Sequence, residues 1–437
     1  MSRYIIEGGH RLQGSVCIQG AKNSALPILA ACVVGCGEHV IRNCPQLSDV
    51  DATVEILRHI GCKVRRDADC IAVDSTNVTA GSIPDLLMHE MRSSVIFLGA
   101  IAARIGDAQL SLPGGCEIGL RPIDLHLDAL RKLGAVITEE GGRIHLSCPD
   151  GLHGATVALS FPSVGATENV LIAACTAKGT TTLINAAREP EISDLADFLN
   201  RCGAHISGAG EGIITVEGVR KLHAAEHCVI PDRIAAGSYM IAAAVTRGDV
   251  FVENIIPAHL GPMVGLFESF GCRIDMEGRR MHLRAPKRLK AVPAIRTMPY
   301  PGFPTDMQAP FMTACAVAEG TGVIVETVFE SRFRHVPELL KLGADIFVDG
   351  RTAVIKGVPV LNGAVVGASD LRGGFALIAG GLAAQGETTV HSLRHTDRGY
   401  HALDANLRNL GARIRRINDD EEKDEKEYRA GSAGFAE

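Results

Sequence analysis

Amphipathic stretches of the chain end in glycine and are followed at once by short stretches in which apolar and polar residues alternate. One four-residue signature marks this transition: glycine, then alanine or cysteine, then any residue, then valine or isoleucine. It occurs six times, 68 to 73 residues apart, as GCKV at 61, GAVI at 134, GAHI at 203, GCRI at 271, GADI at 343 and GARI at 411. Glycine there is typical of the left-handed residue that ends a helix, and the β-branched residue favours a strand. The spacing predicts six copies of one structural unit.

The third copy displays the whole unit. A strand is expected within VALSFPSV (157–164), a helix over 165–179, a strand within TTTLINAA (180–187) and an amphipathic helix over 190–203. A hairpin follows the signature, so the unit reads β-α-β-α-β-β, which makes the protein an α/β protein. The first helix of each unit is apolar on nearly every side, and we therefore expect it to be buried on most sides.

The start of the chain resembles the pieces that the sixth copy lacks. GARIRRI ends without a hairpin partner, while RYIIEG (3–8) resembles that strand, and LQGSVCIQ (12–19) resembles the first strand of a unit. If the copies pack three by three, one domain comprises residues 1–19 with 230–417, and the other comprises residues 20–229. Periodicity alone equally allows a single ring of six.

Composition favours a globular protein with ample cores, since the chain has 437 residues, of which 46% are hydrophobic. No apolar run reaches the length of about 18 residues that spans a bilayer, and no secretory signal is evident, so we expect a cytoplasmic protein without a membrane partner. A formal charge of -6 and the lack of tryptophan argue against a nucleic-acid partner. Residues 418–437, acidic and then small, are expected to form a disordered tail. The oligomeric state is left open.

Polar residues recur at the start of the first helix of each unit, 37 to 42 residues before the signature glycine. They are Lys22-Asn23, Arg92-Ser93, Ser163, Asp232-Arg233, Asp306, and Asp370 with Arg372. Loops before the second helix carry arginines at matching places: Arg42, Arg121, Arg188, Arg332 with Arg334, and Arg394 with Arg398. One interpretation treats these residues as helix caps and solvated loop residues.

The capping interpretation does not cover Lys22, Arg92 and Arg372, because a cation at a helix start opposes the helix dipole. Helix starts and guanidinium groups both bind phosphate and carboxylate, so the pattern predicts a ligand with several anionic groups. Among such cations Asp306 should stay ionised, and it could then accept a proton from a substrate hydroxyl.

Cys116 lies in SLPGGCEIGLRP (111–122), directly behind two glycines and five residues before Arg121. Most cysteines are small core residues, and the chain has 13 of them without paired spacing. Glycines let a loop close over a ligand, nearby cations favour thiolate, and a dry site favours thiol. We therefore predict that Cys116 is a reactive thiol.

Several long segments resemble the enolpyruvyl transferases, and within that family the members that act on UDP-N-acetylglucosamine. They are GAKNSALPIL, SLPGGCEIGLRPIDLH, FPSVGATEN, NAAREPEI, PGFPTDMQA, ETVFESRFRHVPEL, SDLRGG and HTDRGY, within about residues 1–417. The resemblance implies a two-domain fold, barrel-like with inverted α/β order, with three units per domain and ligands in the cleft between the domains. It thereby implies the three-by-three arrangement.

The implied reaction transfers the enolpyruvyl group of phosphoenolpyruvate to the 3-hydroxyl of UDP-N-acetylglucosamine, by addition and then elimination of phosphate. The resemblance places this step at the opening of peptidoglycan synthesis and implies inhibition by fosfomycin. One alternative is the sister enzyme that uses 3-phosphoshikimate, and another is a non-catalytic relative that binds the UDP-sugar. The first would not need Cys116, and the second could lose Cys116 or Asp306, so their presence favours the UDP-sugar enzyme.

Matching positions imply the roles of individual residues. Cys116 would protonate the methylene carbon and could form a covalent adduct, Asp306 would take the hydroxyl proton, and Lys22 and Arg398 would complete the catalytic set. Phosphoenolpyruvate would contact Lys22, Asn23, Arg121, Arg332, Asp370, Arg372 and Arg398. UDP-N-acetylglucosamine would contact Asn23, Arg92, Arg121, Pro122, Ile123, Asp124, Leu125, Ser163, Val164, Gly165, Asp306 and Val328. No metal or organic cofactor is expected. Some members have a lysine before the SVG triplet where this chain has Phe161-Pro162, so Arg121 is expected to serve the diphosphate instead.

Overall fold

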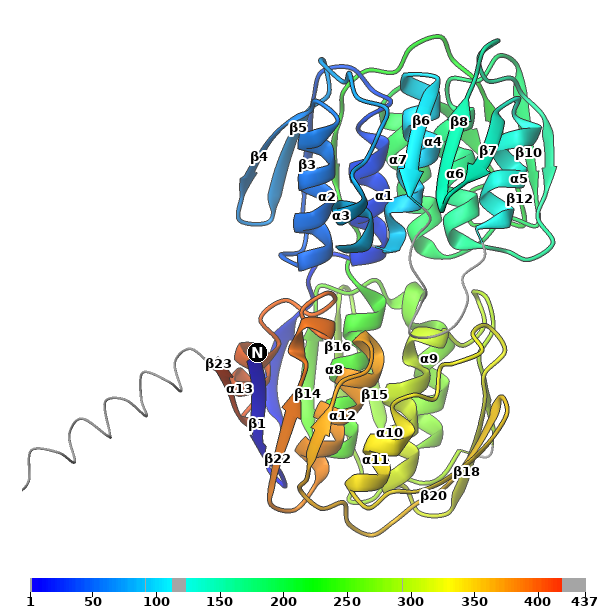
Figure 1. The fold of residues 1–437 in the computed structure, drawn as a ribbon. Coiled ribbons are helices and arrows are strands. Elements are labelled where there is room, and N and C mark those ends of the chain that lie inside the picture. The colour runs from blue at the N-terminus through cyan, green and yellow to red at the C-terminus, as the bar shows by residue number, and fades with distance from the viewer. Residues whose placement is uncertain (1, 91, 112–122, 293, 419–437) are drawn as a thin grey trace, which may run out of the picture.

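The computed structural model describes residues 2–90, 92–111, 123–292 and 294–418, and in these residues the strands form six separate sheets (Figure 1). Five sheets have four strands and one has three. Five of them contain the antiparallel hairpin that follows a signature glycine, as predicted, and in the sixth the strand after Gly411 pairs with β1 from the start of the chain. The six predicted copies are therefore six real units.

In every sheet the order of strands across the sheet differs from their order in the chain. Three sheets run β13 (Glu226–Cys228), β3 (Glu38–Arg42), β5 (Cys70–Asp74) and β4 (Lys63–Asp67); β6 (Asp107–Ser111), β8 (Arg143–Ser147) and β7 (Val136–Glu140); and β11 (His205–Ser207), β12 (Ile213–Glu217), β10 (Thr180–Ile184) and β9 (Thr156–Ala158). The others run β15 (Arg273–Glu277), β16 (Arg280–Arg284), β14 (Asp249–Glu253) and β2 (Gln13–Cys17); β17 (Ile295–Arg296), β18 (Thr321–Val325), β20 (Thr352–Lys356) and β19 (Asp345–Asp349); and β21 (Val365–Gly367), β22 (Glu387–His391), β1 (Ser2–Glu7) and β23 (Arg413–Asn418).

Each unit has an inner and an outer helix. The inner helices are α1 (Lys22–Ala31), α4 (Phe97–Arg104), α6 (Val164–Ala174), α8 (Arg233–Val245), α10 (Gln308–Val317) and α12 (Leu371–Ala383). The outer helices are α2 (Ser48–His59), α5 (Asp124–Lys132), α7 (Pro190–Arg201), α9 (Pro257–Ser269), α11 (Val336–Lys341) and α13 (Leu403–Asn409). A short helix α3 (Asp85–Glu90) and the 3-10 turns η1 (Arg92–Ile96), η2 (Thr305–Met307) and η3 (Leu393–His395) complete the set.

The six signature glycines all have left-handed backbone conformations, with φ between +88° and +107°. This conformation is typical of the residue that ends a helix. Glycine adopts it at little cost because it has no Cβ. The glycine caps predicted from sequence are confirmed at every copy.

The first and the last of the described strands lie in one sheet, as predicted. Strand β1 lies between β22 and β23 and is antiparallel to both, while β2 runs parallel to β14 in the place of a first strand. The first unit is completed in a way that the sequence did not reveal, because its parallel strand is β13, more than 180 residues after β3. The three residues of β13 are too few to show a hydrophobic pattern.

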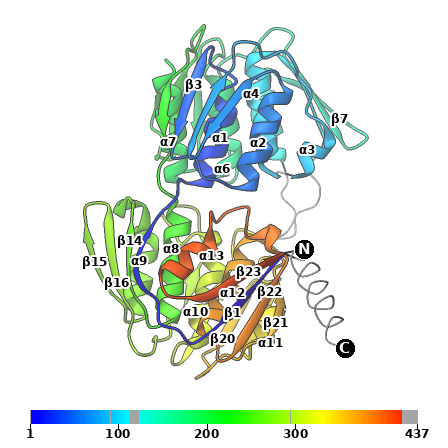
Figure 2. The same cartoon turned by 90° about the vertical axis from the view of Figure 1, so that its left-hand side faces the viewer.

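The buried apolar residues form two clusters. One draws on residues 21–229, and the other draws on residues 4–18 together with 234–414. We call the corresponding parts the first lobe and the second lobe; they are the upper and lower halves of Figures 1 and 2. This division supports the domain boundaries after residues 19 and 229, which we retain as a proposal.

The chain passes between the lobes along two segments that lie side by side. Gly20 and Pro231 form an antiparallel bridge, and Ala21 N donates to Ile230 O at 2.7 Å. Asp232 N donates to Gln19 O at 2.9 Å. A Cβ at Gly20 would lie 1.7 Å from a backbone oxygen of a neighbouring loop, so no other residue fits this crossing.

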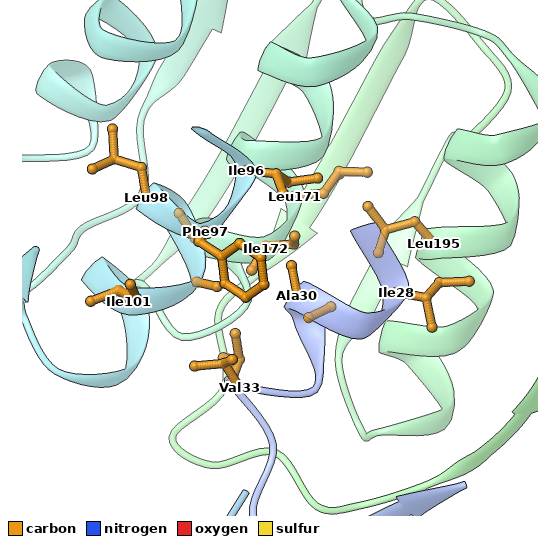
Figure 3. Close-up of a cluster of buried hydrophobic side chains, with 14 of the residues drawn as sticks. Ile28, Ala30, Val33, Ile96, Phe97, Leu98, Ile101, Leu171, Ile172 and Leu195 are labelled. Carbon is orange, nitrogen blue, oxygen red and sulfur yellow. The ribbon is translucent and has the colours of Figure 1, made fainter. Parts of the chain in front are cut away.

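The inner helices form the core of each lobe, which confirms the prediction that they are buried. In the first lobe, Ala30 of α1 lies close to Phe97 of α4 and to Ile172 of α6, while Ile28 of α1 lies beside Leu195 of α7 (Figure 3). In the second lobe all thirteen residues of α8 are buried. Within the described ranges, no helix has both the length and the apolar character needed to cross a bilayer.

Candidate active site

Asp306 lies between two buried arginines just before α10 in the second lobe. Arg332 Nη2 donates to Asp306 Oδ1 at 2.8 Å, and Arg372 Nη2 donates to Asp306 Oδ2 at 3.0 Å. Burial alone would raise the pKa of Asp306, but the charges of Arg372, Arg332 and Lys22 hold it well below its ordinary value. The carboxylate is therefore ionised at physiological pH, as the sequence indicated.

The two arginines keep hydrogen-bonding capacity beyond Asp306. Arg372 Nη1 donates to the Tyr400 hydroxyl at 3.1 Å, which in turn lies 2.9 Å from the Ser238 hydroxyl. The Nε atoms of Arg332 and Arg372 are buried, and no other atom of the described residues bonds to them. Two fixed guanidinium groups with unused N–H donors are chemically suited to a carboxylate or a phosphate.

A second carboxylate, Asp49, joins cations from both lobes. Asp49, only 2% exposed, lies in the first turn of α2, where Lys22 Nζ is 3.0 Å and Arg398 Nε is 2.8 Å from its oxygens. Burial would raise its pKa, but Lys22 and Arg398 lower it overall. Lys22 was expected to need an anionic partner, and in this structure that partner is the carboxylate of Asp49.

Sequence reasoning missed Asp49. An acidic residue in the first turn of a helix is ordinarily explained by the helix dipole. One indication was present in the sequence: Asp49 lies in the first turn of the second helix of the unit whose first helix begins with Lys22.

A further ion pair crosses between the lobes beside the connecting segments. Arg233 Nε donates to both carboxylate oxygens of Glu191, at 3.0 and 3.3 Å, and both side chains are buried. Glu189 Oε1 accepts from Tyr300 N at 3.2 Å. Burial, together with repulsion from Glu191 and Glu189, raises the pKa of nearby Glu168 to about 8. These carboxylates were also missed, because their partners are distant in sequence.

Three predicted residues serve as helix caps in the structure. Ser163 Oγ accepts from Ala166 N at 3.3 Å. Asp232 Oδ1 accepts from two backbone N–H groups of α8, both at 2.9 Å, and Asp370 Oδ1 accepts from two of α12, both at 3.0 Å. The capping interpretation is therefore confirmed for these residues, whereas the pairing of Asp306 with two arginines goes beyond it.

The residues predicted to contact the nucleotide sugar form two groups. In the first lobe, Ile123–Leu125 at the start of α5 lies close to Ser163–Gly165 at the start of α6, because a Cβ at Gly165 would lie 2.9 Å from His126 Cε1. In the second lobe, buried Glu326 accepts from Val328 N at 2.8 Å and from Thr305 Oγ1 at 2.9 Å. Glu326 thus ties Val328 to the residue next to Asp306.

Some predicted residues cannot be placed in this geometry. Cys116, Arg121 and Pro122 lie outside the described residues, as does the side chain of Arg92. Asn23 is half-buried beside Lys22 at the start of α1.

A cavity of about 620 Å³ opens where the lobes meet next to the Asp49–Arg398 pair. Ser48 and Asp51 line it from the first lobe, and Asp397 and Tyr400 line it from the second. Asp49 and Arg398 do not line this cavity themselves, but Ser48 and Asp397, their neighbours in the chain, do.

Six related units in two lobes, five of them with four strands and one with three among the described residues, together with buried arginines and carboxylates where the lobes meet, fit the class of the enolpyruvyl transferases. The family model described as EPSP synthase (3-phosphoshikimate 1-carboxyvinyltransferase) matches residues 6–415, and the chain belongs to this family. The fold prediction of two domains with three units each is confirmed.

The curated relatives are more specific. UDP-N-acetylglucosamine 1-carboxyvinyltransferase 2 of Caldanaerobacter subterraneus subsp. tengcongensis is 50% identical over 418 residues, which are 95% of this chain and 100% of the relative. UDP-N-acetylglucosamine 1-carboxyvinyltransferase 1 of Symbiobacterium thermophilum is 47% identical over 420 residues, 95% of each chain.

Solved structures agree on the architecture. The enolpyruvyl transferase NikO of Streptomyces tendae superimposes with a TM-score of 0.87 at 27% identity, over 95% of this chain and 99% of its own. An EPSP synthase of Acinetobacter baumannii superimposes with a TM-score of 0.74 at 18% identity, over 96% of this chain and 100% of its own, and shows the fold alone.

Proposed function

We propose that this protein transfers the enolpyruvyl group of phosphoenolpyruvate to the 3-hydroxyl of UDP-N-acetylglucosamine and releases phosphate. The observation that carries the proposal is Asp306, ionised and held by Arg332 and Arg372 where the lobes meet. The names of relatives at 46–50% identity over 95% of the chain supply the sugar nucleotide.

The first chemical step is an addition. Asp306 accepts the proton of the sugar 3-hydroxyl while the hydroxyl oxygen bonds to carbon 2 of phosphoenolpyruvate, and Cys116 delivers a proton to carbon 3. Positive charge develops at carbon 2, so the two proton-transfer groups and the reacting oxygen must be aligned in a site from which water is excluded.

The second step is an elimination. The bond between carbon 2 and the phosphate oxygen breaks, the thiolate left at Cys116 takes a proton from carbon 3, and Asp306 gives up the hydroxyl proton to the departing phosphate. The enolpyruvyl ether and phosphate are the products, and both groups return to their starting forms. Fixed cations stabilise the leaving group, and one such preorganised group typically contributes about 100- to 1000-fold in rate.

The cations divide between the two anionic ends of phosphoenolpyruvate. Arg332 and Arg372, with Asp370 as their acidic neighbour, bind the carboxylate, which matches the unused N–H donors of their guanidinium groups. Lys22, Arg121 and Arg398 bind the phosphate, with Asn23 beside them. Asp49 supports this assignment because it already draws Lys22 and Arg398 together from different lobes.

The nucleotide sugar occupies the first lobe and reaches into the second. Its contacts in this proposal are Asn23, Arg92, Arg121, Pro122, Ile123, Asp124, Leu125, Ser163, Val164, Gly165, Asp306 and Val328. The product would feed peptidoglycan synthesis in the cytoplasm, and fosfomycin would modify Cys116. A 3-phosphoshikimate enzyme is not favoured, since the solved EPSP synthase is only 18% identical.

The test is a phosphate-release assay with three acceptor conditions: UDP-N-acetylglucosamine, shikimate 3-phosphate, and none. We expect release from phosphoenolpyruvate only with the UDP-sugar. Release with shikimate 3-phosphate alone, or none in any condition, would contradict the proposal. Mass spectrometry after fosfomycin treatment should show one added inhibitor on the peptide that contains Cys116.

A further inference from the structure

The side-chain amide of Asn169, in the middle of α6, is fully buried and forms hydrogen bonds with three separate segments. Its Oδ1 accepts from Gly99 N at 2.8 Å, and its Nδ2 donates to Val95 O at 3.0 Å. The same Nδ2 lies 2.7 Å from His126 Nδ1. One side chain thus ties α6 to η1, to α4 and to α5.

The bond to His126 has a defined direction. Burial lowers the pKa of His126 to about 4, so its ring is neutral at physiological pH. With Asn169 Oδ1 accepting from Gly99, Nδ2 is the donor, and His126 Nδ1 must be the acceptor. The ring also packs against Gly165, where a Cβ would lie 2.9 Å from His126 Cε1. Asn169 therefore sets the position of the start of α5 relative to the start of α6.

We propose that Asn169 is a positioning residue for nucleotide-sugar binding, an inference that rests on the proposed function. Each segment that it joins to α6 lies next to or carries proposed contacts: Arg92 in η1, Ile123–Leu125 at α5 and Ser163–Gly165 at α6 itself. Without the amide, buried backbone groups of Gly99 and Val95 lose their partners, and the segments must shift to satisfy them. A displacement of about 1 Å can reduce the effectiveness of a site by roughly 100-fold.

The inference predicts selectivity between the two substrates. Of the proposed contacts of phosphoenolpyruvate, only Asn23 and Arg121 are shared with the UDP-sugar. Lys22, Arg332, Arg372 and Arg398 are not, and the hydrogen bonds of Asn169 go to Gly99, Val95 and His126. The second lobe offers a matched control, because fully buried Thr313 on α10 donates to Ala376 O of α12 at 3.0 Å. That bond also joins two inner helices, but it involves none of the proposed sugar contacts.

The test compares Asn169→Asp, His126→Asn and Thr313→Val in the full-length chain. Calorimetry gives the Kd of UDP-N-acetylglucosamine, steady-state kinetics give both KM values with the other substrate saturating, and melting gives Tm. We expect Asn169→Asp to raise the Kd and KM of the UDP-sugar by about 10- to 100-fold, with the KM of phosphoenolpyruvate within about twofold. Thr313→Val should lower Tm and leave the Kd unchanged.

His126→Asn keeps the bonds of Asn169 to Gly99 and Val95, so it retains the fold even if Asn169→Asp does not. It should raise the Kd of the UDP-sugar in the same direction by a smaller factor. If the wild-type protein turns over, either of two results would overturn the positioning role. One is an unchanged Kd of the UDP-sugar in both Asn169→Asp and His126→Asn, and the other is an equal increase in the KM values of the two substrates. A wild-type protein that neither binds the UDP-sugar nor releases phosphate with it would overturn the proposed function, and this inference with it.

Discussion

The two lobes are built from the same unit, yet they place different side chains at the starts of their inner helices. The first lobe has Lys22, Arg92 and Ser163 at these places, and the second has Asp232, Asp306 and Asp370. In the second lobe, Asp232 and Asp370 cap their helices, whereas Asp306 binds two arginines and caps no described helix. The unit thus provides a recurring frame in which the same residue type, aspartate, caps a helix in two copies and pairs with two arginines in the third.

The largest expected effect comes from comparing the kcat of an Asp306 variant with that of an Asp232 variant. Asp306→Asn removes the charge that Arg332 and Arg372 surround, and it removes the proposed proton acceptor, so kcat should fall about 100- to 1000-fold. Asp232→Asn should lose less than about tenfold, because asparagine caps a helix nearly as well as aspartate. Phosphate-release kinetics measure both. Equal losses in the two variants would show that the helix starts of the second lobe are not specialised.

Substitutions at two signature glycines, one in each lobe, test how the local surroundings affect stability. Gly61→Ala and Gly411→Ala both force a Cβ into a left-handed conformation, which should cost about 1 kcal/mol. At Gly61 the new Cβ would also lie 2.4 Å from Asn77 O, whereas at Gly411 the nearest described atom is 3.7 Å away. Gly61→Ala should therefore lower the free energy of unfolding by about 2 to 3 kcal/mol in total. Urea unfolding would measure this, and equal effects would show that backbone conformation alone matters.

The Asp49–Arg398 pair tests how the lobes cooperate. Asp49→Asn keeps the shape of the side chain but no longer holds Lys22 and Arg398 at one point, so the KM of phosphoenolpyruvate should rise about tenfold. The Kd of UDP-N-acetylglucosamine should change little. A lower KM for phosphoenolpyruvate would instead mean that Asp49 competes with the substrate for these cations.

The smallest expected effect is a pH dependence from Glu168 in the first lobe. Its folded pKa of about 8 exceeds that of an exposed glutamate, so the native state keeps a proton that the unfolded chain releases. Stability should then fall as the pH rises from about 4.5 to 8 and level off above it. Glu168→Gln cannot ionise, so relative to wild type it should gain stability at pH 8.5 and none at pH 4. Unfolding curves at both pH values measure the difference, and an equal gain at each would exclude ionisation as the cause.

Local patterns allowed much of the fold to be predicted. Each signature glycine, each hairpin and the pairing of the N-terminal strand with the sixth unit follow from short stretches of sequence. The pairing of β3 with β13, which completes the first unit, was missed because β13 is only three residues long.

The site was predicted less completely. Lys22 and Arg372 were found because they stand at unfavourable places in a helix, whereas Asp49 and Glu191 stand at favourable ones that the helix dipole already explains. Asp49 binds Arg398, which is 349 residues away, and Glu191 binds Arg233, which is 42 residues away. Only the folded chain brings these partners together.

The position of β1 between β22 and β23 bears on the order in which the protein is made. A ribosome completes every strand of the first lobe once Cys228 has emerged, so that lobe can fold while synthesis continues. Among the described strands, β1 is synthesised first and its two neighbours last, so it must wait, unpaired, while all the other strands are made. Tyr4 and Ile6, which are buried in the folded protein, therefore stay without their sheet partners until the last two described strands have been made.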